Sequence, residues 1–506
     1  MLPDFAQTLA LFLDPALLAL VVGGTLLGIV VGAVPGLTAT LAIALLLPFT
    51  FALPPVPSIV MLTGIFIGGI YGGSISAIAV RIPGAPASAM TMLDGNAMAR
   101  RGETEAAMGL ATFSSFVGGS AGGVILVLFA PQLARIALEF QSPEMFALVL
   151  LALVAVSTVT ADSLAKGFAA TLIGMMLATV GIDGLMPVPR FTFGVTNLLT
   201  GVPQLAVVIG LFAVTELFLQ AGVREPKSVR SNPVSFARVF SFWPYVKQVG
   251  WRIFAKSSLI GTLVGALPGA GAAMAAFLAY SEAKRSSKDP DSFGKGNPAG
   301  VVAPETSNNA MTGGALIPML AFGIPGDAVT AVILGGLMIQ GIIPGPQLFR
   351  ESATLVQPLF VGYFISYGVL LVAGLAFLPL YAKIISVPRS ILFPFIGAIA
   401  VAAAFVAGRT SFAMFVAVGV GVLGYVLQRF GYPVVPVLLG LILGPMLETN
   451  FRRSLIISRG DVSVFFTSPI SAILIAASVV FAIYFGYVLP RRVRRKEAAT
   501  RSEGEP

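Results

Sequence analysis

Residues 28–40 read GIVVGAVPGLTAT and residues 261–273 read GTLVGALPGAGAA, with seven identities in thirteen aligned positions. Each stretch places a Pro-Gly pair in the middle of an otherwise continuous apolar segment, where proline removes a backbone donor and breaks the helical hydrogen-bond ladder. In a bilayer, backbone groups freed in this way are tolerated only against protein or a water-filled cavity. The sequence therefore predicts two broken or re-entrant helices, one in each half of the chain.

The remaining sequence is typical of a membrane protein. Of its 506 residues, 57% are hydrophobic and 10% are charged, whereas soluble proteins carry about 25% charged residues. Apolar runs of about twenty residues, the length that crosses a bilayer as a helix, recur along the chain. We therefore expect an all-α polytopic membrane protein with about 11 or 12 membrane segments.

Several chemistries are excluded by composition. The chain has no cysteine and no histidine, so disulfides, thiol nucleophiles, Ser-His triads and imidazole metal sites are ruled out. It has no GxxxxGK[ST] phosphate loop, which excludes nucleotide hydrolysis by that route. We expect no enzyme activity and no cofactor apart from Na⁺ or H⁺ as a coupling ion. The net charge of +9 indicates loop orientation and contact with anionic lipid, not nucleic-acid binding.

Basic residues mark the cytoplasmic side under the positive-inside rule. Five of the six residues 491–496 are Arg or Lys, and they follow the apolar segment 470–489, so we expect a cytoplasmic C-terminus. The segment 223–256 is also basic and holds both tryptophans. We interpret it as an amphipathic linker at the headgroups, with a solvated basic linker as the alternative. Residues 1–14 lack the basic region of a signal peptide, so we expect the first apolar stretch to be retained.

Further internal matches indicate a duplication. Gly-Gly followed by Ile-Pro-Gly occurs within residues 72–84 and again within residues 313–326. A third match pairs residues 131–136 with residues 379–384, and the offset between copies rises from 233 to 248 along the chain. The predicted organisation is a first repeat at 1–222, the cytoplasmic linker at 223–256, a second repeat at 257–490 and a basic cytoplasmic tail at 491–506.

The charges around the two Pro-Gly elements indicate that the repeats are inverted. Basic residues flank the second element on both sides, whereas the first is flanked by uncharged or acidic sequence. A hairpin that enters from the cytoplasm in one copy and from outside in the other fits this pattern. Arg135 and Lys383 argue against inversion, because they carry the same charge at equivalent positions.

The Pro-Gly elements are candidate sites for an anionic substrate. Helix amino termini and freed backbone N–H groups bind anions, and glycine allows close approach. In the first copy two threonines add hydroxyls that suit a carboxylate or a sodium ion, whereas the second copy offers backbone alone. Glycines at Gly-x3-Gly spacing have the alternative role of close helix packing. The candidate substrate-binding residues are Pro35, Gly36, Thr38, Thr40, Tyr71, Gly73, Ser74, Pro268, Gly269 and Gly271.

Three further residues are candidates for ion coupling. Asp327 lies in apolar sequence after a Pro-Gly pair, and an acid in a membrane segment is a functional candidate because burying it unpaired costs several kcal/mol. Its alternative role is to cap a helix. Asn308 and Asn309 carry carbonyl oxygens suited to a hard cation such as sodium, although interhelical hydrogen bonds would equally explain them.

Four stretches resemble the large membrane subunit of the tripartite tricarboxylate transporters. They are GAVPGLTATLAIALLLPFTF from Gly32, YGGSISAIAVRIPGAPAS from Tyr71, FGKGNPAGVVAPETSNNA from Phe293 and GGALIPMLAFGIPGDAVTAVILGGLMIQGIIPGPQLF from Gly313. The resemblance implies a carboxylate transporter of the bacterial inner membrane, with a small four-helix membrane subunit and a periplasmic substrate-binding protein as partners. It also implies sodium or proton coupling and inverted repeats that move as an elevator. Positions where this chain departs from the family's usual residues are Arg81, Asn96, Ala299 and Gln340.

The leading functional hypothesis is ion-coupled uptake of a di- or tricarboxylate by alternating access. A passive anion channel is an alternative, which paired broken helices disfavour because they suit an occluded site. An intramembrane enzyme is a third alternative. It would need a nucleophile or facing acids, and the intramembrane acids, Glu305 and Asp327, are scattered among binding-type motifs.

Overall fold

The computed structural model describes residues 5–160, 163–221, 236–342, 344–351, 353–377, 380 and 389–488. Within these residues the protein is almost entirely helical, and the one sheet is a two-residue antiparallel pair of β1 and β2. The prediction of an all-α polytopic membrane protein is confirmed. The third repeat signature at 379–384 and the basic tail at 491–506 lie outside the described residues, apart from Leu380, as do residues 222–235 of the first repeat and linker.

The elements of the first half are α1 Phe5–Leu11, α2 Pro15–Ala33, α3 Ala39–Thr50, α4 Pro55–Val80, α5 Ser88–Arg100, α6 Thr104–Ala137, α7 Ser142–Val159, α8 Leu164–Ala178, β1 Gly181–Ile182, β2 Pro189–Arg190, η1 Thr196–Leu198, α9 Gln204–Val208, η2 Ile209–Val214 and α10 Thr215–Gln220. Those that follow are η3 Phe236–Phe242, α11 Trp243–Val249, α12 Trp251–Gly265, α13 Gly271–Arg285, η4 Pro290–Ser292, α14 Ala299–Phe322, α15 Ala328–Ile339, α16 Leu348–Glu351, α17 Ala353–Ala376, α19 Arg389–Gly408, α20 Ser411–Arg429, α21 Val434–Ile457, α22 Val464–Thr467, α23 Pro469–Ile483 and η5 Tyr484–Val488.

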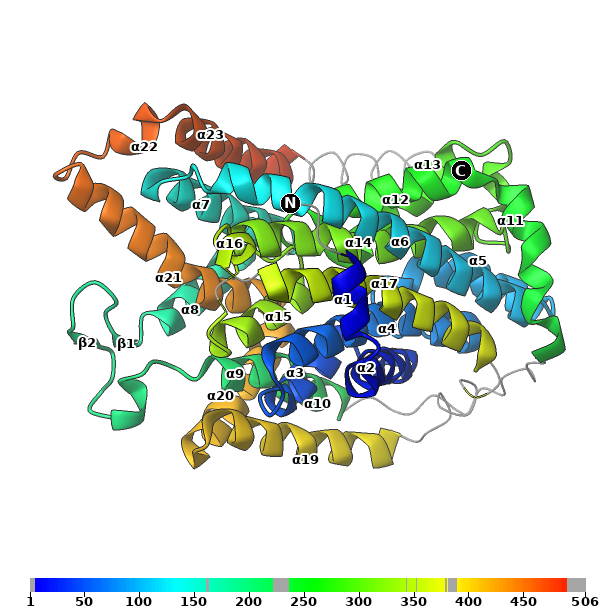
Figure 1. Ribbon diagram of the computed structural model, residues 1–506, viewed down its shortest axis with the longest axis horizontal. Coiled ribbons are helices and arrows are strands. Elements are labelled where there is room, and N and C mark those ends of the chain that lie inside the picture. The colour runs from blue at the N-terminus through cyan, green and yellow to red at the C-terminus, as the bar shows by residue number, and fades with distance from the viewer. Residues whose placement is uncertain are drawn as a thin grey trace, which may run out of the picture.

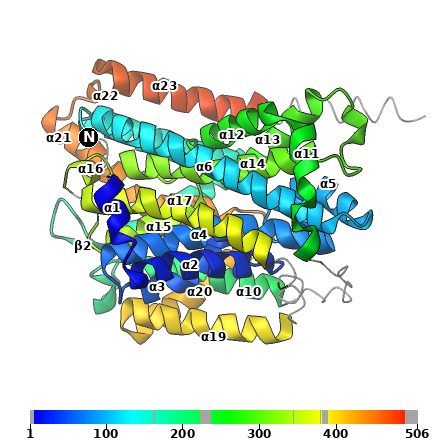
Figure 2. The ribbon, with the colours of Figure 1, turned by 45° about the vertical axis from the view of Figure 1, so that its right-hand side comes forward.

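Eight of the described helices are long and apolar enough to cross a membrane, and five shorter apolar helices accompany them. The chain is therefore a multi-pass membrane protein. The expected total of about 11 or 12 segments stays a prediction, because it depends on which of the shorter helices span the bilayer. The longer helices run along the length of the molecule, with the β1–β2 lobe at one end and α5 and α11 at the other (Figures 1 and 2).

Both predicted helix breaks are present. Pro35 and Gly36 separate α2 from α3, and Pro268 and Gly269 separate α12 from α13. Both glycines adopt positive φ, +90° at Gly36 and +82° at Gly269, a conformation that glycine adopts without steric cost. Each helix break therefore contains the residue type that adopts this conformation most readily.

The two broken helices pack on their neighbours in the same way. A side chain at Gly28 would strike the carbonyl oxygen of Ile65 on α4, and one at Gly261 would strike that of Ser307 on α14. The two glycines are 233 positions apart, and the two carbonyls are 242 positions apart. The missing Cβ atoms let the helix axes approach closely, as in small-xxx-small packing.

The next turn of each pair repeats these contacts at the same offsets. A side chain at Gly32 would strike the Gly69 carbonyl, and one at Gly265 would strike the Met311 carbonyl. The α2–α4 contact and the α12–α14 contact therefore involve equivalent positions of the two halves. Helix packing, the interpretation favoured for these Gly-x3-Gly pairs, agrees with these contacts.

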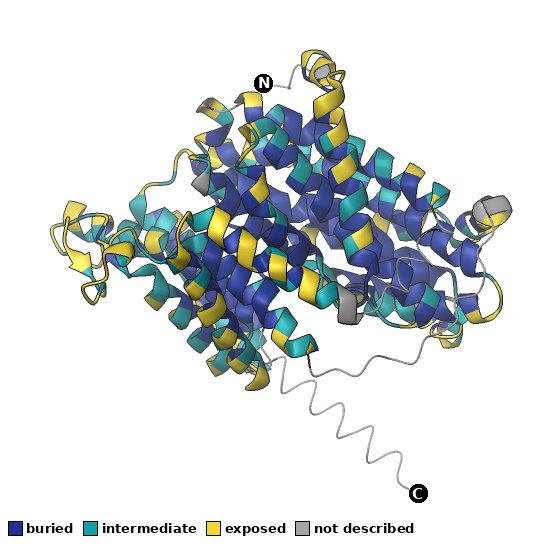
Figure 3. Cartoon of the chain, turned by 90° about the horizontal axis from the view of Figure 1, so that it is seen from below, coloured by how far each residue is buried: buried dark blue, intermediate teal, exposed yellow. Residues whose placement is uncertain are grey.

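The largest cluster of buried apolar residues crosses both halves. Buried residues fill the middle of the molecule and exposed residues lie around the outside (Figure 3). At its centre α14 contacts α6, α12, α13, α5 and α4. Glycines on α6 permit the close α6–α14 crossing, since a side chain at Gly118 or Gly122 would strike the backbone of Thr306 or Ala310. The helix that carries the predicted asparagine pair is thus the most enclosed helix of the molecule.

The described part of the predicted linker, residues 236–256, forms η3, α11 and the start of α12. Trp243 and Trp251 are 46% and 61% exposed, and both rings lie against Phe113 on α6. Aromatic rings that are half covered by protein suit the headgroup level of a bilayer.

We predict that Gly28→Ala destabilises the protein by about 1–3 kcal/mol through overpacking against α4. Gly23→Ala on the same helix is the matched control, because a methyl group at that position would meet no other atom within 4 Å. The measurement is the thermal unfolding midpoint in detergent. Equal midpoints for the two variants would contradict the close α2–α4 contact.

Candidate functional site

A buried acid lies where four helices meet. Glu305 on α14 is 0% exposed. Its Oε1 accepts hydrogen bonds from Ser74 Oγ on α4 at 2.6 Å and from Thr91 Oγ1 on α5 at 2.5 Å. Its Oε2 accepts from Ser115 Oγ on α6 at 3.1 Å. We call these four residues the Glu305 cluster. It joins three helices of the first half to one of the second.

The predicted asparagine pair adjoins this cluster. Asn309 Nδ2 donates to Ser115 Oγ at 2.9 Å, to the Glu305 carbonyl at 3.0 Å and to Asn308 Oδ1 at 2.5 Å. Asn308 Nδ2 has no acceptor among the described residues, although the side chain is fully buried. An orphaned buried donor costs about 1–3 kcal/mol, so it marks a position where a ligand or water fits.

A group of hydroxyls surrounds the asparagines on the other side. Thr312 Oγ1 lies 2.8 Å from the hydroxyls of both Tyr363 and Tyr367 on α17. Tyr367 also donates to the Asn309 carbonyl at 3.1 Å. These contacts fix the asparagine backbone and extend the polar interior toward α17.

Of the predicted substrate residues on α4, only Ser74 belongs to the Glu305 cluster. The Tyr71 hydroxyl lies 2.7 Å from Thr112 Oγ1 on α6 and is 1% exposed. Gly73 accepts a hydrogen bond from the Gly84 N–H at 3.2 Å. Tyr71 and Gly73 therefore pack the helices around the site, and their polar groups are already engaged.

The first helix break leaves backbone donors free. Thr38 caps α3 by accepting from the Leu41 N–H at 3.2 Å. Among the residues that the structure describes, no acceptor is bonded to the N–H of Gly36 or Thr38. Pro35 is buried, Thr40 is 8% exposed, and Gly36 and Thr38 are partly exposed. This break presents the amino terminus of a helix with unused N–H groups, which favours an anion.

The second helix break is more fully bonded. The Gly269 N–H donates to the Gly326 carbonyl at 2.8 Å, and a side chain at Gly269 would lie 2.8 Å from Val156 on α7. Pro268 and Gly271 are partly exposed. The two Pro-Gly elements thus differ in the backbone groups that they leave unbonded among the described residues, a difference that the sequence did not predict.

Asp327 caps α15. Its Oδ1 accepts from the Thr330 N–H at 2.8 Å and from Thr330 Oγ1 at 2.6 Å, while the Asp327 N–H donates to Thr330 Oγ1 at 3.0 Å. The carboxylate is 6% exposed, and no basic side chain of the described residues forms a salt bridge with it. The capping interpretation is confirmed, and the coupling role stays a prediction.

A second buried acid, in the middle of α5, ties the halves together. Asp94 is 0% exposed, and its Oδ1 accepts from the N–H groups of Gly294 at 2.8 Å, Gly296 at 2.8 Å and Asn297 at 2.7 Å. Its Oδ2 accepts from the Tyr280 hydroxyl at 2.9 Å. The loop before α14 therefore wraps around a carboxylate from the first half.

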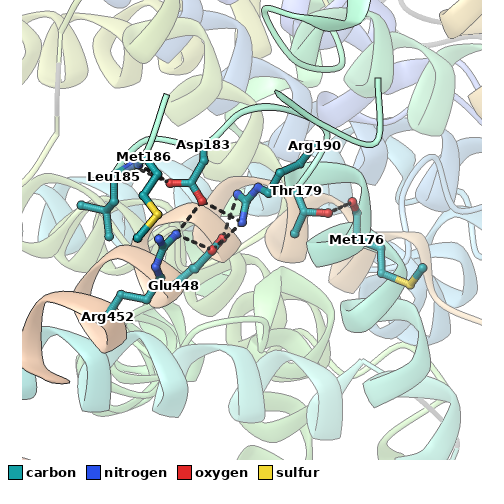
Figure 4. Close-up of polar contacts among 8 residues, drawn as sticks. All are labelled: Met176, Thr179, Asp183, Leu185, Met186, Arg190, Glu448 and Arg452. Atoms are coloured by element: carbon teal, nitrogen blue, oxygen red, sulfur yellow. Dashed lines mark hydrogen bonds and ion pairs between the residues drawn. The ribbon is translucent and has the colours of Figure 1, made fainter. Parts of the chain in front are cut away.

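A cavity of about 800 Å³ lies at the opposite end, among α8, the β1–β2 lobe, α9 and α21. Arg190 contacts Glu448 at 2.6 Å and Asp183 at 3.1 Å, and Arg452 contacts Asp183 at 2.6 Å and Glu448 at 3.1 Å (Figure 4). Hydrogen bonds from the backbone N–H groups of Met186 and Leu185, with the bond from Arg452, hold the pKa of Asp183 well below its usual range. None of the predicted substrate or ion residues lines this cavity.

Sequence reasoning missed Thr91, Ser115 and the role of Asp94, and it noted Glu305 only as a candidate catalytic acid. Thr91 and Ser115 lie 214 and 190 positions from Glu305, so no local motif joins them. The sequence offered one signal for this cluster: a glutamate in an apolar segment, between Pro304 and the polar residues 306–309.

Residues 18–439 match the tripartite tricarboxylate transporter TctA family. The chain belongs to this family. The TctA family is the large subunit of tripartite tricarboxylate transporters, which also contain a substrate-binding protein and a small subunit. The resemblance in the sequence motifs is confirmed.

Two relatives come from Agrobacterium vitis. A protein described as an uncharacterized 52.8 kDa protein in the TAR-I ttuC' 3' region is 38% identical over 466 residues, which cover 91% of this chain and 92% of the relative. A protein described as uncharacterized in the TAR-II ttuC' 3' region is 40% identical over 223 residues, which cover 44% of this chain and 92% of the relative. No solved structure matches the chain.

We predict that Asp94→Ala loosens the loop at 290–298, because three backbone donors lose their acceptor. One of them, the N–H of Gly296, is buried, and a buried orphan costs about 1–3 kcal/mol. Limited proteolysis should cut this loop faster in the variant than in the parent protein. Asp291→Ala, an exposed position in the same loop, should leave the cleavage rate unchanged. Equal cleavage of both variants would show that Asp94 does not hold the loop.

Proposed function

We propose that this TctA-family protein imports a di- or tricarboxylate across the bacterial inner membrane by alternating access, driven by an ion gradient. Membership of the family supports carboxylate transport. In the proposed assembly a periplasmic binding protein delivers the substrate, a small four-helix membrane subunit completes the membrane part, and the C-terminus faces the cytoplasm.

The free N–H groups at the first helix break are the observation that carries the substrate site. Gly36 and Thr38 offer donors without acceptors among the described residues, at the amino terminus of α3, where the helix dipole favours negative charge. The Thr38 and Thr40 hydroxyls add further donors. At the second break the Gly269 N–H is already bonded to the Gly326 carbonyl, so it holds the neighbouring backbone in place. We propose that Pro268 and Gly271 shape the site.

We propose that the two halves, 1–222 and 257–490, are inverted repeats that move relative to each other. The duplicated contacts of Gly28 with Ile65 and of Gly261 with Ser307 support two copies of one unit. The Glu305 cluster lies between the halves, so a relative motion must break its hydrogen bonds. Cation coupling through Asn308 and Asn309 would link such a motion to ion movement.

Uptake by proteoliposomes tests the proposal. The chain is reconstituted with its small subunit and binding protein, and labelled citrate and succinate are supplied as tricarboxylate and dicarboxylate probes. Accumulation above the external concentration that requires a Na⁺ or H⁺ gradient supports coupled transport. Equilibration without accumulation indicates a channel, and a chemically altered product indicates an enzyme; either result contradicts the proposal.

We predict that Asp327→Asn abolishes gradient-driven uptake and leaves the unfolding midpoint unchanged. Asparagine caps helices about as well as aspartate, so this variant removes the charge and keeps the cap. Thr330→Ala is the complementary variant, because it weakens the capping box and keeps the charge. Normal uptake by Asp327→Asn would leave Asp327 with a capping role only.

A further inference from the structure

The Glu305 carboxylate lies in the interior with no positive charge to balance it. It is 0% exposed, its polar side-chain neighbours are three hydroxyl groups and the neutral amide of Asn308, and no salt bridge among the described residues includes it. An isolated charge in a low-dielectric interior is costly enough that the group takes up a proton or a cation instead. The closed arrangement of helices therefore requires a bound positive charge at Glu305.

We propose that Glu305 is the proton carrier of the transport cycle, an inference that rests on the proposed function. In the closed state the carboxyl group holds a proton and is neutral. When the halves separate and water enters, the carboxyl O–H bond breaks, the proton passes to water on the open side, and the carboxylate remains. Water on the other side returns a proton before the cluster closes again.

The spacing of the oxygens favours a proton over a metal ion. Oxygen ligands of a hard cation lie about 2.3–2.6 Å from the ion, taking calcium as the reference. The Ser74 and Thr91 hydroxyls instead lie 2.6 and 2.5 Å from Glu305 Oε1 itself. Oxygens in direct contact leave no space for an ion between them.

The surrounding hydrogen bonds fit both protonation states. Each hydroxyl can donate to the carboxylate or accept from the carboxyl O–H by rotating. Ser115 Oγ lies 3.1 Å from Glu305 Oε2 and accepts from Asn309 Nδ2, so it connects the carboxyl group to the asparagine pair. The hydroxyl groups can therefore satisfy either protonation state of Glu305 by rotating.

No neighbouring group competes with Glu305 for this role. Asp94 on α5 accepts three backbone N–H groups and the Tyr280 hydroxyl. The charged groups nearer the ends of α4, α5 and α6 lie about 10 Å (Arg81) to about 30 Å (Arg135) along the helix axes from the cluster, at 1.5 Å per residue. The titratable or charged groups on the helices that pack against α14 around Glu305 are Tyr71 and Arg81 on α4 or at its end, Asp94, Arg100 and Arg101 on α5 or at its end, Glu103, Glu105 and Arg135 on α6 or at its end, Arg252 and Lys256 on α12, Tyr280, Glu282, Lys284 and Arg285 on α13, and Tyr363 and Tyr367 beyond Asn309 on α17.

The location of the cluster links the proton to the motion. Its hydroxyls come from α4, α5 and α6, whereas the carboxyl group comes from α14. Separation of the halves would remove the hydroxyls and expose the carboxyl group together. Proton release and opening would then favour each other, as reciprocal coupling between two equilibria requires.

Glu305→Gln tests the proposal, because glutamine has the shape of the protonated carboxyl group and cannot release a proton. The assay uses the complete assembly in proteoliposomes, with labelled citrate and succinate as probes and a pH-sensitive dye to follow proton entry. The parent protein should accumulate substrate under a pH gradient alone and should take up protons with substrate. Glu305→Gln should lose both and retain exchange of labelled for unlabelled substrate across the membrane, since exchange needs no net proton movement.

Three results would overturn the proton role: pH-driven uptake by Glu305→Gln, accumulation by the parent protein under a Na⁺ gradient with no proton entry, or loss of exchange together with uptake in a variant that folds normally. Absence of both uptake and exchange in the parent protein would instead reject the proposed function.

If Glu305→Gln does not fold, the variant Ser115→Ala tests the proton role of Glu305. It should shift the pH dependence of uptake, whereas Ser114→Ala, whose hydroxyl has no partner among the described residues, should not. An unchanged pH profile in Ser115→Ala would reject the proposal.

Discussion

Lipid offers no hydrogen bonds, and this constraint shapes the whole protein. A helix broken inside a bilayer must find partners for its freed N–H and C=O groups within the protein, in water or on a ligand. At Pro268 and Gly269 the neighbouring backbone supplies a partner, whereas at Gly36 and Thr38 no described residue does. The first break, between α2 and α3, is therefore the position where we propose that a substrate carboxylate replaces the missing hydrogen bonds.

Close helix packing makes the polar interior possible. Glycines on α2, α12 and α6 bring α4 and α14 within backbone contact of their neighbours. Hydroxyl groups on different helices then come close enough to satisfy Glu305, which no single helix could do. The same packing excludes water from the carboxyl group in the closed state, and this exclusion gives the carboxyl group its dependence on a bound positive charge.

Local pattern predicted the helix breaks, the small-residue packing and the family. A Pro-Gly pair breaks the helix that contains it, and a Gly-x3-Gly spacing lets that helix pack closely. Both effects can therefore be recognised from a short stretch of sequence. The Glu305 cluster could not be predicted, because its hydrogen bonds join residues about two hundred positions apart and depend on how α4, α5 and α6 approach α14. For Asp327 the local sequence could not distinguish two roles, because its context fits both a coupling acid and a helix cap. The hydrogen bonds to Thr330 show that it caps the helix.

Substrate protection of a single introduced cysteine tests most directly whether the first break holds the substrate. The natural chain has no cysteine, so Thr38→Cys provides one reactive thiol beside the free N–H groups, and Thr200→Cys in the distant cavity provides the control. Citrate or succinate should slow thiol labelling at position 38 and leave labelling at position 200 unchanged. If position 38 reacts equally with and without a substrate that the assembly transports, the break does not bind the substrate.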